Sequence, residues 1–165
     1  MNGIEQVKNA LAKKLAEGGI TAVDAWSRRG LPQLEKAVAV LGIQETESDT
    51  ASMWNYLGDV WDETLGHPVE RYGRRLQLKL FVDFYAPKGC AKDIEAGCER
   101  LEELFLTPLV EGIQGNSVQR GELSYDRTSG YLKCRCTVMC LAYFTATRAE
   151  ENALLTDFTL KGVLQ

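Results

Sequence analysis

The cysteines are the residues of this chain most able to do chemistry, and their spacing argues against a site. Cys134 and Cys136 stand two apart in a strand-like segment, where such side chains share one face about 7 Å apart along the strand. That separation does not suit a disulfide. Cys140 has the same parity, and the single histidine, His67, cannot complete a zinc site. We therefore expect all five cysteines to be reduced, metal-free and, on that strand face, buried as small hydrophobes: Cys90, Cys98, Cys134, Cys136 and Cys140.

The remaining polar residues form no recognisable catalytic set. His67 stands beside Pro68 in a turn-like stretch, which is typical of a solvated surface histidine. The acidic groups at 59–63 and 102–103 resemble paired carboxylates, but the second pair lies on the polar face of a predicted helix. No glycine pattern matches a phosphate-binding or dinucleotide-binding loop. The sequence predicts no enzymatic activity and no cofactor.

The three tryptophans stand outside the best-patterned segments. Trp26, Trp54 and Trp61 fall beside turns or in a weakly alternating stretch. A tryptophan in such a place is either a plug at the edge of the core or an anchor for a partner. We predict a projecting hairpin at 53–72, and we predict that it contacts other subunits through Trp54, Tyr56 and Trp61.

Two helices are expected to position these residues. Residues 3–17 place apolar side chains at spacings of three and four, and glycines follow at 18–19. A second stripe predicts a helix over about 91–106, limited by Pro108. Short strands are expected at 20–26 and 36–43, the latter covered on both faces, and a mobile acidic loop at 44–52.

The strongest strand signal runs over 75–86, where every even position is apolar. Further strands are expected at 117–125 and 131–145, joined by a turn at 126–130, and a C-terminal arm at 148–165. These elements predict an α+β fold in which two helices pack on a mostly antiparallel sheet. We expect a single domain over 1–165.

The length and net charge of the chain argue against nucleic-acid-binding and membrane-spanning proteins. The chain has 165 residues, 45% of them hydrophobic, and a formal net charge of −4. An acidic chain without a basic run is a poor candidate for specific nucleic-acid binding. The longest uncharged run, 136–147, is shorter than the roughly 18 residues of a membrane-spanning helix, and no secretory signal is evident. We expect synthesis in a cytoplasm and no membrane partner.

The order of short motifs resembles a known group of proteins. The stretches that carry the resemblance are Val23-Asp24-Ala25-Trp26-Ser27, Ala37-Val38-Ala39-Val40, Tyr56-Leu57-Gly58, Tyr72-Gly73-Arg74, Leu80-Phe81-Val82-Asp83-Phe84-Tyr85-Ala86-Pro87 and Asp157-Phe158-Thr159-Leu160-Lys161-Gly162. Together they look like tail-region proteins of prophages in Gram-positive bacteria. The pattern is similar to the tail terminator proteins of long-tailed phages, as in phage lambda.

The resemblance implies a structural role and no catalytic residues. Tail terminators are small α+β subunits that form a hexameric ring capping the tail tube. The implied partners are further copies of the chain together with tail-tube and head–neck proteins, and the implied location is the phage virion. The net negative charge of the chain fits a ring subunit that lets DNA pass without binding it. Three alternatives stay open: a head–tail connector or other neck protein, a cytosolic ligand-binding α+β domain with a pocket on the sheet face, and a small enzyme using His67.

Overall fold

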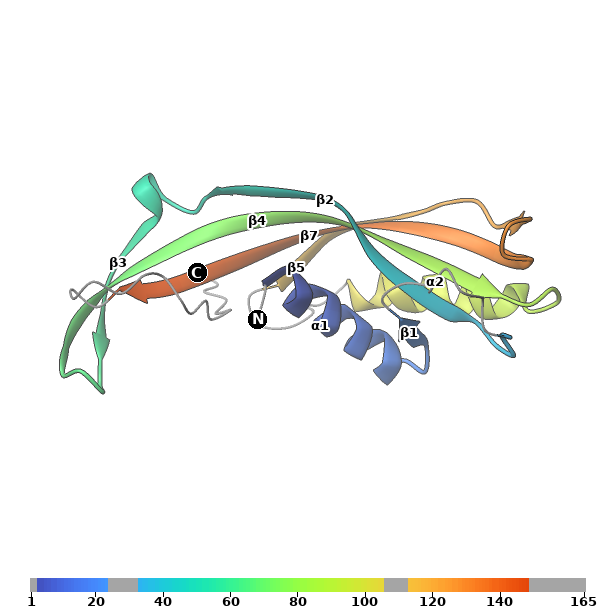
Figure 1. Cartoon of the computed structure of the whole chain (residues 1–165), viewed down its shortest axis with the longest axis horizontal. Coiled ribbons are helices and arrows are strands. Elements are labelled where there is room, and N and C mark those ends of the chain that lie inside the picture. Colours follow the sequence, from blue (N-terminus) through green and yellow to red (C-terminus); the bar gives the residue numbers. More distant parts are fainter. Residues whose placement is uncertain (1–2, 24–32, 106–112, 149–165) are drawn as a thin grey trace.

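The computed structural model describes residues 3–23, 33–105 and 113–148. In these ranges two α-helices accompany one seven-stranded sheet, which confirms the predicted α+β class (Figure 1). The elements are α1 Gly3–Glu17, β1 Thr21–Val23, β2 Val38–Thr50, a short 3-10 turn η1 Met53–Asn55, β3 Tyr56–Asp62, β4 His67–Ala86, α2 Ala91–Leu104, β5 Ile113–Arg120, β6 Ser124–Asp126 and β7 Tyr131–Arg148. Neither helix has the length and apolar character needed to cross a membrane.

Two very long strands form the centre of the sheet. The strand order is β1-β2-β4-β7-β5, with β3 beside β4 and β6 beside β7. β4 and β7 pair antiparallel without interruption from Glu70–Arg148 to Ala86–Leu132. Only the pairing of β1 with β2 is parallel. Because no register shift interrupts the pairing of β4 with β7, alternate side chains of β4 stay on one face of the sheet along this whole pairing.

The core lies between one face of this sheet and the two helices. The even positions of β4 from Leu76 to Ala86 are all buried, as the alternation predicts. Cys134, Cys136 and Cys140 of β7 face the same core. The apolar stripes of α1 and α2 close it with the following buried side chains: Val7, Leu11, Leu15, Ile94, Cys98 and Leu101.

The sheet extends well beyond its helices. Both helices lie against one half of the sheet, and the long strands continue past them to the hairpin of β3 and β4 at the opposite end (Figure 1). We call the first part the helix-covered half. We call residues 43–50, 56–62, 67–76 and 143–148 the distal half.

Several predicted boundaries agree with the structure, and one prediction is wrong. Strand β2 begins with four buried residues, Val38–Leu41, as expected for a strand covered on both faces. The expected mobile loop at 44–52 is instead the continuation of β2 through Thr50. Its polar residues pair with β4, where Glu45 is opposite Lys79 and Asp49 is opposite Arg75. A β-bulge between Ile43 and Glu45 separates the apolar part of the strand from the polar part.

Other differences are smaller. Residues 53–55 form a 3-10 turn, so the hairpin strand starts at Tyr56. The strand expected at 117–125 is divided into β5 and β6 by the connection at 121–123. Of the strand expected at 20–26, residues 20–23 are described and 21–23 form β1, whereas Trp26 lies outside the described residues. Of the predicted C-terminal arm at 148–165, only Arg148 is described.

Candidate protein interaction surface

Large apolar side chains gather on the hairpin at the distal end. Met53 is 82% exposed, Trp54 85% and Trp61 63%. We call this group the hairpin surface, and its exposed members are Met53, Trp54, Tyr56, Val60, Trp61 and Leu65. The structure thus places the three residues predicted as interface contacts outside the core. Scattered exposed hydrophobics are ordinary on a protein surface, so their grouping on one hairpin makes the hairpin surface the candidate interaction site.

The backbone that presents Trp54 is strained. Trp54 and Asn55 both have positive φ, 57° and 62°. Asparagine tolerates this left-handed conformation, whereas a bulky residue such as tryptophan rarely adopts it. Two bonds fix the turn: the Asn55 amide donates to the Ser52 carbonyl at 3.1 Å, and the Ser52 hydroxyl donates to the Tyr56 carbonyl. Strain held by local bonds beneath an exposed aromatic is typical of functional sites.

The aromatic residues of the hairpin share one face of the sheet. The Tyr56 and Tyr72 rings meet edge to face at 5.8 Å. Trp61 pairs with Pro68, an even position of β4, and therefore lies on the same face. This is the face that carries the core farther along β4.

Two carboxylates lie beside the tyrosines of this face. The Tyr56 hydroxyl donates to Asp59 at 2.8 Å, and the Tyr72 hydroxyl donates to Glu70 at 2.7 Å. These hydrogen bonds raise the pKa of each tyrosine, because loss of the phenol proton would end the bond and place two negative charges together. Both phenols therefore stay protonated and hold their rings in place.

A groove of about 330 Å³ runs along the base of the hairpin surface. Its walls combine apolar and cationic groups: Trp54, Asn55, Tyr72, Gly73, Arg74, Phe144 and Ala146. The side-chain oxygen of Asn55 is buried there and has no hydrogen-bond partner among the described residues. A buried acceptor without a donor is costly, and a partner that brings a donor into the groove would remove that cost.

The distal half has one strand edge without a neighbour among the described residues. There β2 beyond Val40 pairs only with β4, so its other edge is open over 41–50. That edge is acidic, with Glu45, Glu47 and Asp49 on one face. On the other side of the sheet, β5 pairs with β7 only as far as Ala142 in the described chain.

The distal end of β7 is next to basic side chains. β7 ends at Arg148, and its distal part pairs with the segment of β4 that contains Arg71, Arg74 and Arg75. Arg75 is engaged by Asp49 of β2 at 2.7 Å, whereas Arg74 is exposed and lines the groove. The acidic edge of β2 and the distal end of β7 therefore differ in charge.

The polar residues weighed as catalytic candidates have structural contacts. His67 is exposed as the first residue of β4 rather than part of the turn, and its Nδ1 lies 2.9 Å from the Pro68 carbonyl oxygen. Asp62, opposite His67, accepts the amides of Thr64 and Leu65 at 2.8 and 3.0 Å and so closes the hairpin turn. Its carboxylate oxygen is occupied by the backbone.

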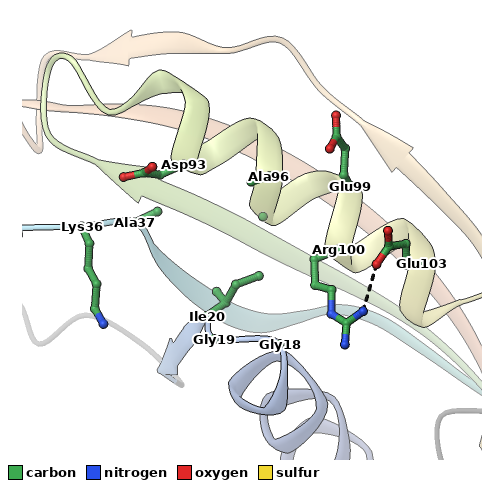
Figure 2. Close-up of a pocket in the computed structure, with 11 residues that line it drawn as sticks. Gly18, Gly19, Ile20, Lys36, Ala37, Asp93, Ala96, Glu99, Arg100 and Glu103 are labelled. Atoms are coloured by element: carbon green, nitrogen blue, oxygen red, sulfur yellow. Dashed lines mark hydrogen bonds and ion pairs between the residues drawn. The ribbon is translucent and has the colours of Figure 1, made fainter.

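A second hollow, of about 520 Å³, lies between the two helices and the start of β2 (Figure 2). Lys36 and Arg100 bring positive charge to it, and three acids line it as well: Asp93, Glu99 and Glu103. Arg100 reaches toward the glycines that end α1 and pairs with Glu103 at 2.9 Å (Figure 2). All three acids are exposed, so this cleft is a solvated hollow. It does not lie on the sheet face where the sequence alternative placed a ligand pocket.

The structure brings together cysteines that the sequence could not connect. Cys98 of α2 lies 3.8 Å from Cys134 and 3.6 Å from Cys136, measured between sulfurs. All three are buried, and Cys134 and Cys136 share the core face with Cys140, as predicted. The hydrogen bond between the Cys98 and Cys136 thiols, which keeps Cys98 protonated, and burial raise the pKa of Cys98, while burial raises that of Cys140 to about 12. The sequence signal for Cys98 was only its place in a helical stripe.

A scan against models of protein families and a search of curated proteins find nothing that matches the chain.

Proposed function

We propose that this chain is a structural subunit of a phage virion, similar to a tail terminator, which assembles into a ring and caps the tail tube. The observation that carries the proposal is the hairpin surface, with Trp54 and Trp61 exposed at the end of a sheet that outgrows its helices. The resemblance of the short sequence motifs to terminator proteins is the reason for proposing a phage tail as the assembly. The subunit has no catalytic task in this proposal.

The hairpin surface has the properties of a contact anchor. Tryptophan and tyrosine are enriched where protein interfaces concentrate their binding energy. The strained turn under Trp54 holds one of these side chains in place before any partner arrives. Because that order exists already in the monomer, less conformational entropy is lost on binding.

Two oppositely charged regions of the distal half support a head-to-tail arrangement. A ring requires two different surfaces on each subunit, so that one copy's first surface meets the next copy's second. The acidic edge of β2 and the basic end of β7 near Arg148 and Arg74 are such a pair by charge. Contact between them would also cover the edge of β2, and uncovered strand edges invite aggregation. The hexameric number comes from the resemblance.

The test compares assembly with monomer stability in one double variant. Trp54→Ser with Trp61→Ser should abolish ring formation, measured by light scattering after size exclusion, alone and with purified tail tubes. Its thermal unfolding should match that of the wild type, since neither side chain belongs to the core. The control is Tyr125→Ser, which removes an exposed aromatic from β6 and should leave assembly intact. Monomers in both settings for the wild type, or unfolding of the double variant, would overturn the proposal.

The nearest alternative is a head–tail connector or other neck protein, which would use the same surface toward a different partner. Electron microscopy of mixtures separates the two roles. A terminator adds density to the end of isolated tail tubes, whereas a connector binds DNA-filled heads that lack tails. Binding to heads and not to tubes would favour the connector.

The charged cleft between the helices is the observation that favours a ligand-binding domain instead. Lys36 and Arg100 could hold an anionic small molecule there. Lys36→Ala with Arg100→Ala should leave ring assembly unchanged if the terminator proposal holds. Loss of assembly in this variant, with the fold intact, would move the functional site to the cleft.

A further inference from the structure

We propose that Cys98, Cys134 and Cys136 form a three-thiolate site for a soft metal ion of low coordination number, with Cu(I) as the matching ion. The sulfurs of the three residues all lie within 4.8 Å of one another. This inference is independent of the assembly role, because the cluster lies in the helix-covered half and the hairpin surface in the distal half.

The sulfur spacing fits a single central ion. Three thiolates around one metal in a plane, each about 2.3 Å from it, are about 4.0 Å apart. The separations from Cys98 are 3.6 Å to Cys136 and 3.8 Å to Cys134. Small side-chain rotations therefore convert the cluster into a coordination triangle without moving the backbone.

The donor set favours a soft ion that accepts three ligands. Among the described residues, these three sulfurs are the only Cys, His, Asp or Glu groups in the cluster. Structural zinc almost always takes four protein ligands. Sites made of thiolates alone select Cu(I) among the ions that accept fewer ligands.

The surroundings supply a countercharge and a short path from solvent. Three thiolates and Cu(I) carry a net charge of −2, and the three thiol protons leave to solvent on binding. The exposed Arg120 guanidinium lies close enough to Cys98 and Cys134 for the thiolates to raise its pKa. The Cys134 sulfur also lies 3.4 Å from the carbonyl oxygen of Gly121, an exposed residue, so the cluster lies close to the protein surface.

Coordination would link α2 to the sheet. Cys98 belongs to the helix and the other two ligands to β7, at sequence separations of 36 and 38 residues. An ion bound only by the folded chain raises the unfolding temperature. Metal binding is thus visible as stabilisation as well as stoichiometry.

The chain contains its own control for the test. Cys140 is buried on the same face of the same strand but lies outside the cluster. The reduced full-length protein is titrated with Cu(I) under nitrogen against excess bicinchoninate, and retained copper is counted by native mass spectrometry. The wild type and Cys140→Ser should each retain one ion and unfold at a higher temperature with copper. Cys98→Ser and Cys136→Ser should retain none, a loss of at least 100-fold in affinity.

Two further measurements keep the outcome decisive if a serine variant fails to fold. Cys98→Ala replaces the ligand without burying a hydroxyl, and X-ray absorption of the wild-type complex reports the ligands directly. Three sulfur neighbours per copper support the site. No copper retained by the wild type, full retention by Cys98→Ala, nitrogen or oxygen neighbours, or preferential four-coordinate Zn²⁺ binding would each overturn it. A disulfide in the purified chain, two hydrogens lighter and unable to bind copper after reduction, would overturn it as well.

Discussion

The two halves of the sheet are built from the same strands, but one half is buried by helices and the other exposes its aromatic side chains. In the helix-covered half, the even face of β4 carries Leu78, Leu80 and Phe84, and the helices bury it. In the distal half, the same face carries Tyr72 and is joined by Tyr56 and Trp61 of β3, which are exposed. Alternation along a strand therefore predicts which residues share a face, but it does not predict what covers that face.

The difference divides stability from interaction. Each fully buried side chain of the first half contributes strongly to the free energy of folding, whereas the exposed aromatics of the second half contribute less until a partner buries them. Substitutions in the two halves should therefore differ in kind. We test this with three predictions, given in order of decreasing expected effect.

The largest contrast is expected between Phe84 and Leu65. Phe84 is fully buried, and its ring contacts α2 so closely that a side chain at Gly97 would clash with it at 2.8 Å. Phe84→Ala should lower the free energy of unfolding by about 3–5 kcal/mol. Leu65→Ala, in the exposed hairpin turn, should change it by about 0.5 kcal/mol or less. Urea unfolding followed by circular dichroism measures both, and equal losses would refute the division.

A smaller contrast concerns two carboxylates. Asp83 is 3% exposed and receives two bonds from Arg135, at 2.6 and 2.7 Å, and one ion pair from Lys133 at 3.0 Å. Asp83→Asn should cost about 1–2 kcal/mol, because it leaves two cations without their charged partner and Arg135 is only half-exposed. The matched change in the distal half is Asp59→Asn. It should be near neutral in the same unfolding assay, and a cost like that of Asp83→Asn would count against the comparison.

The smallest effect is a pH dependence at the end of β2. The Thr50 amide and the Arg75 guanidinium bond Asp49 and hold its pKa below the ordinary 3.8. A lowered pKa in the folded state means that this stabilisation is present above the unfolded pKa and is lost as pH falls through the folded pKa. The protection factors of the amides of 45–50 should therefore decrease as the pH is lowered through the folded pKa of Asp49. Asp49→Asn should remove that decrease, and a decrease of equal size in both proteins would contradict the prediction.

Local patterns predicted most of the secondary structure. The stripe of apolar residues and the following glycines placed α1 at the observed bounds, and alternation placed the core residues of β4 and β7. The acidic stretch after Gln44 was mispredicted because its strand state depends on pairing with β4, not on its own composition. Glutamate and aspartate are depleted in strands, and cross-strand partners such as Lys79 and Arg75 compensate for that weak preference here.

The candidate sites likewise divide into one that the sequence predicted and others that it did not. The hairpin surface was predictable, because Trp54, Tyr56 and Trp61 lie in a segment without a clean apolar face. The groove at Phe144, the acidic edge of β2 and the meeting of Cys98 with Cys134 and Cys136 were not predictable. The sequence by itself determined the elements and the faces of each strand, since these follow from periods of 2 and 3.6 residues. Only the tertiary structure decided which faces pack together and where the strands extend beyond the helices. Those contacts join residues tens of positions apart, and no local period records them.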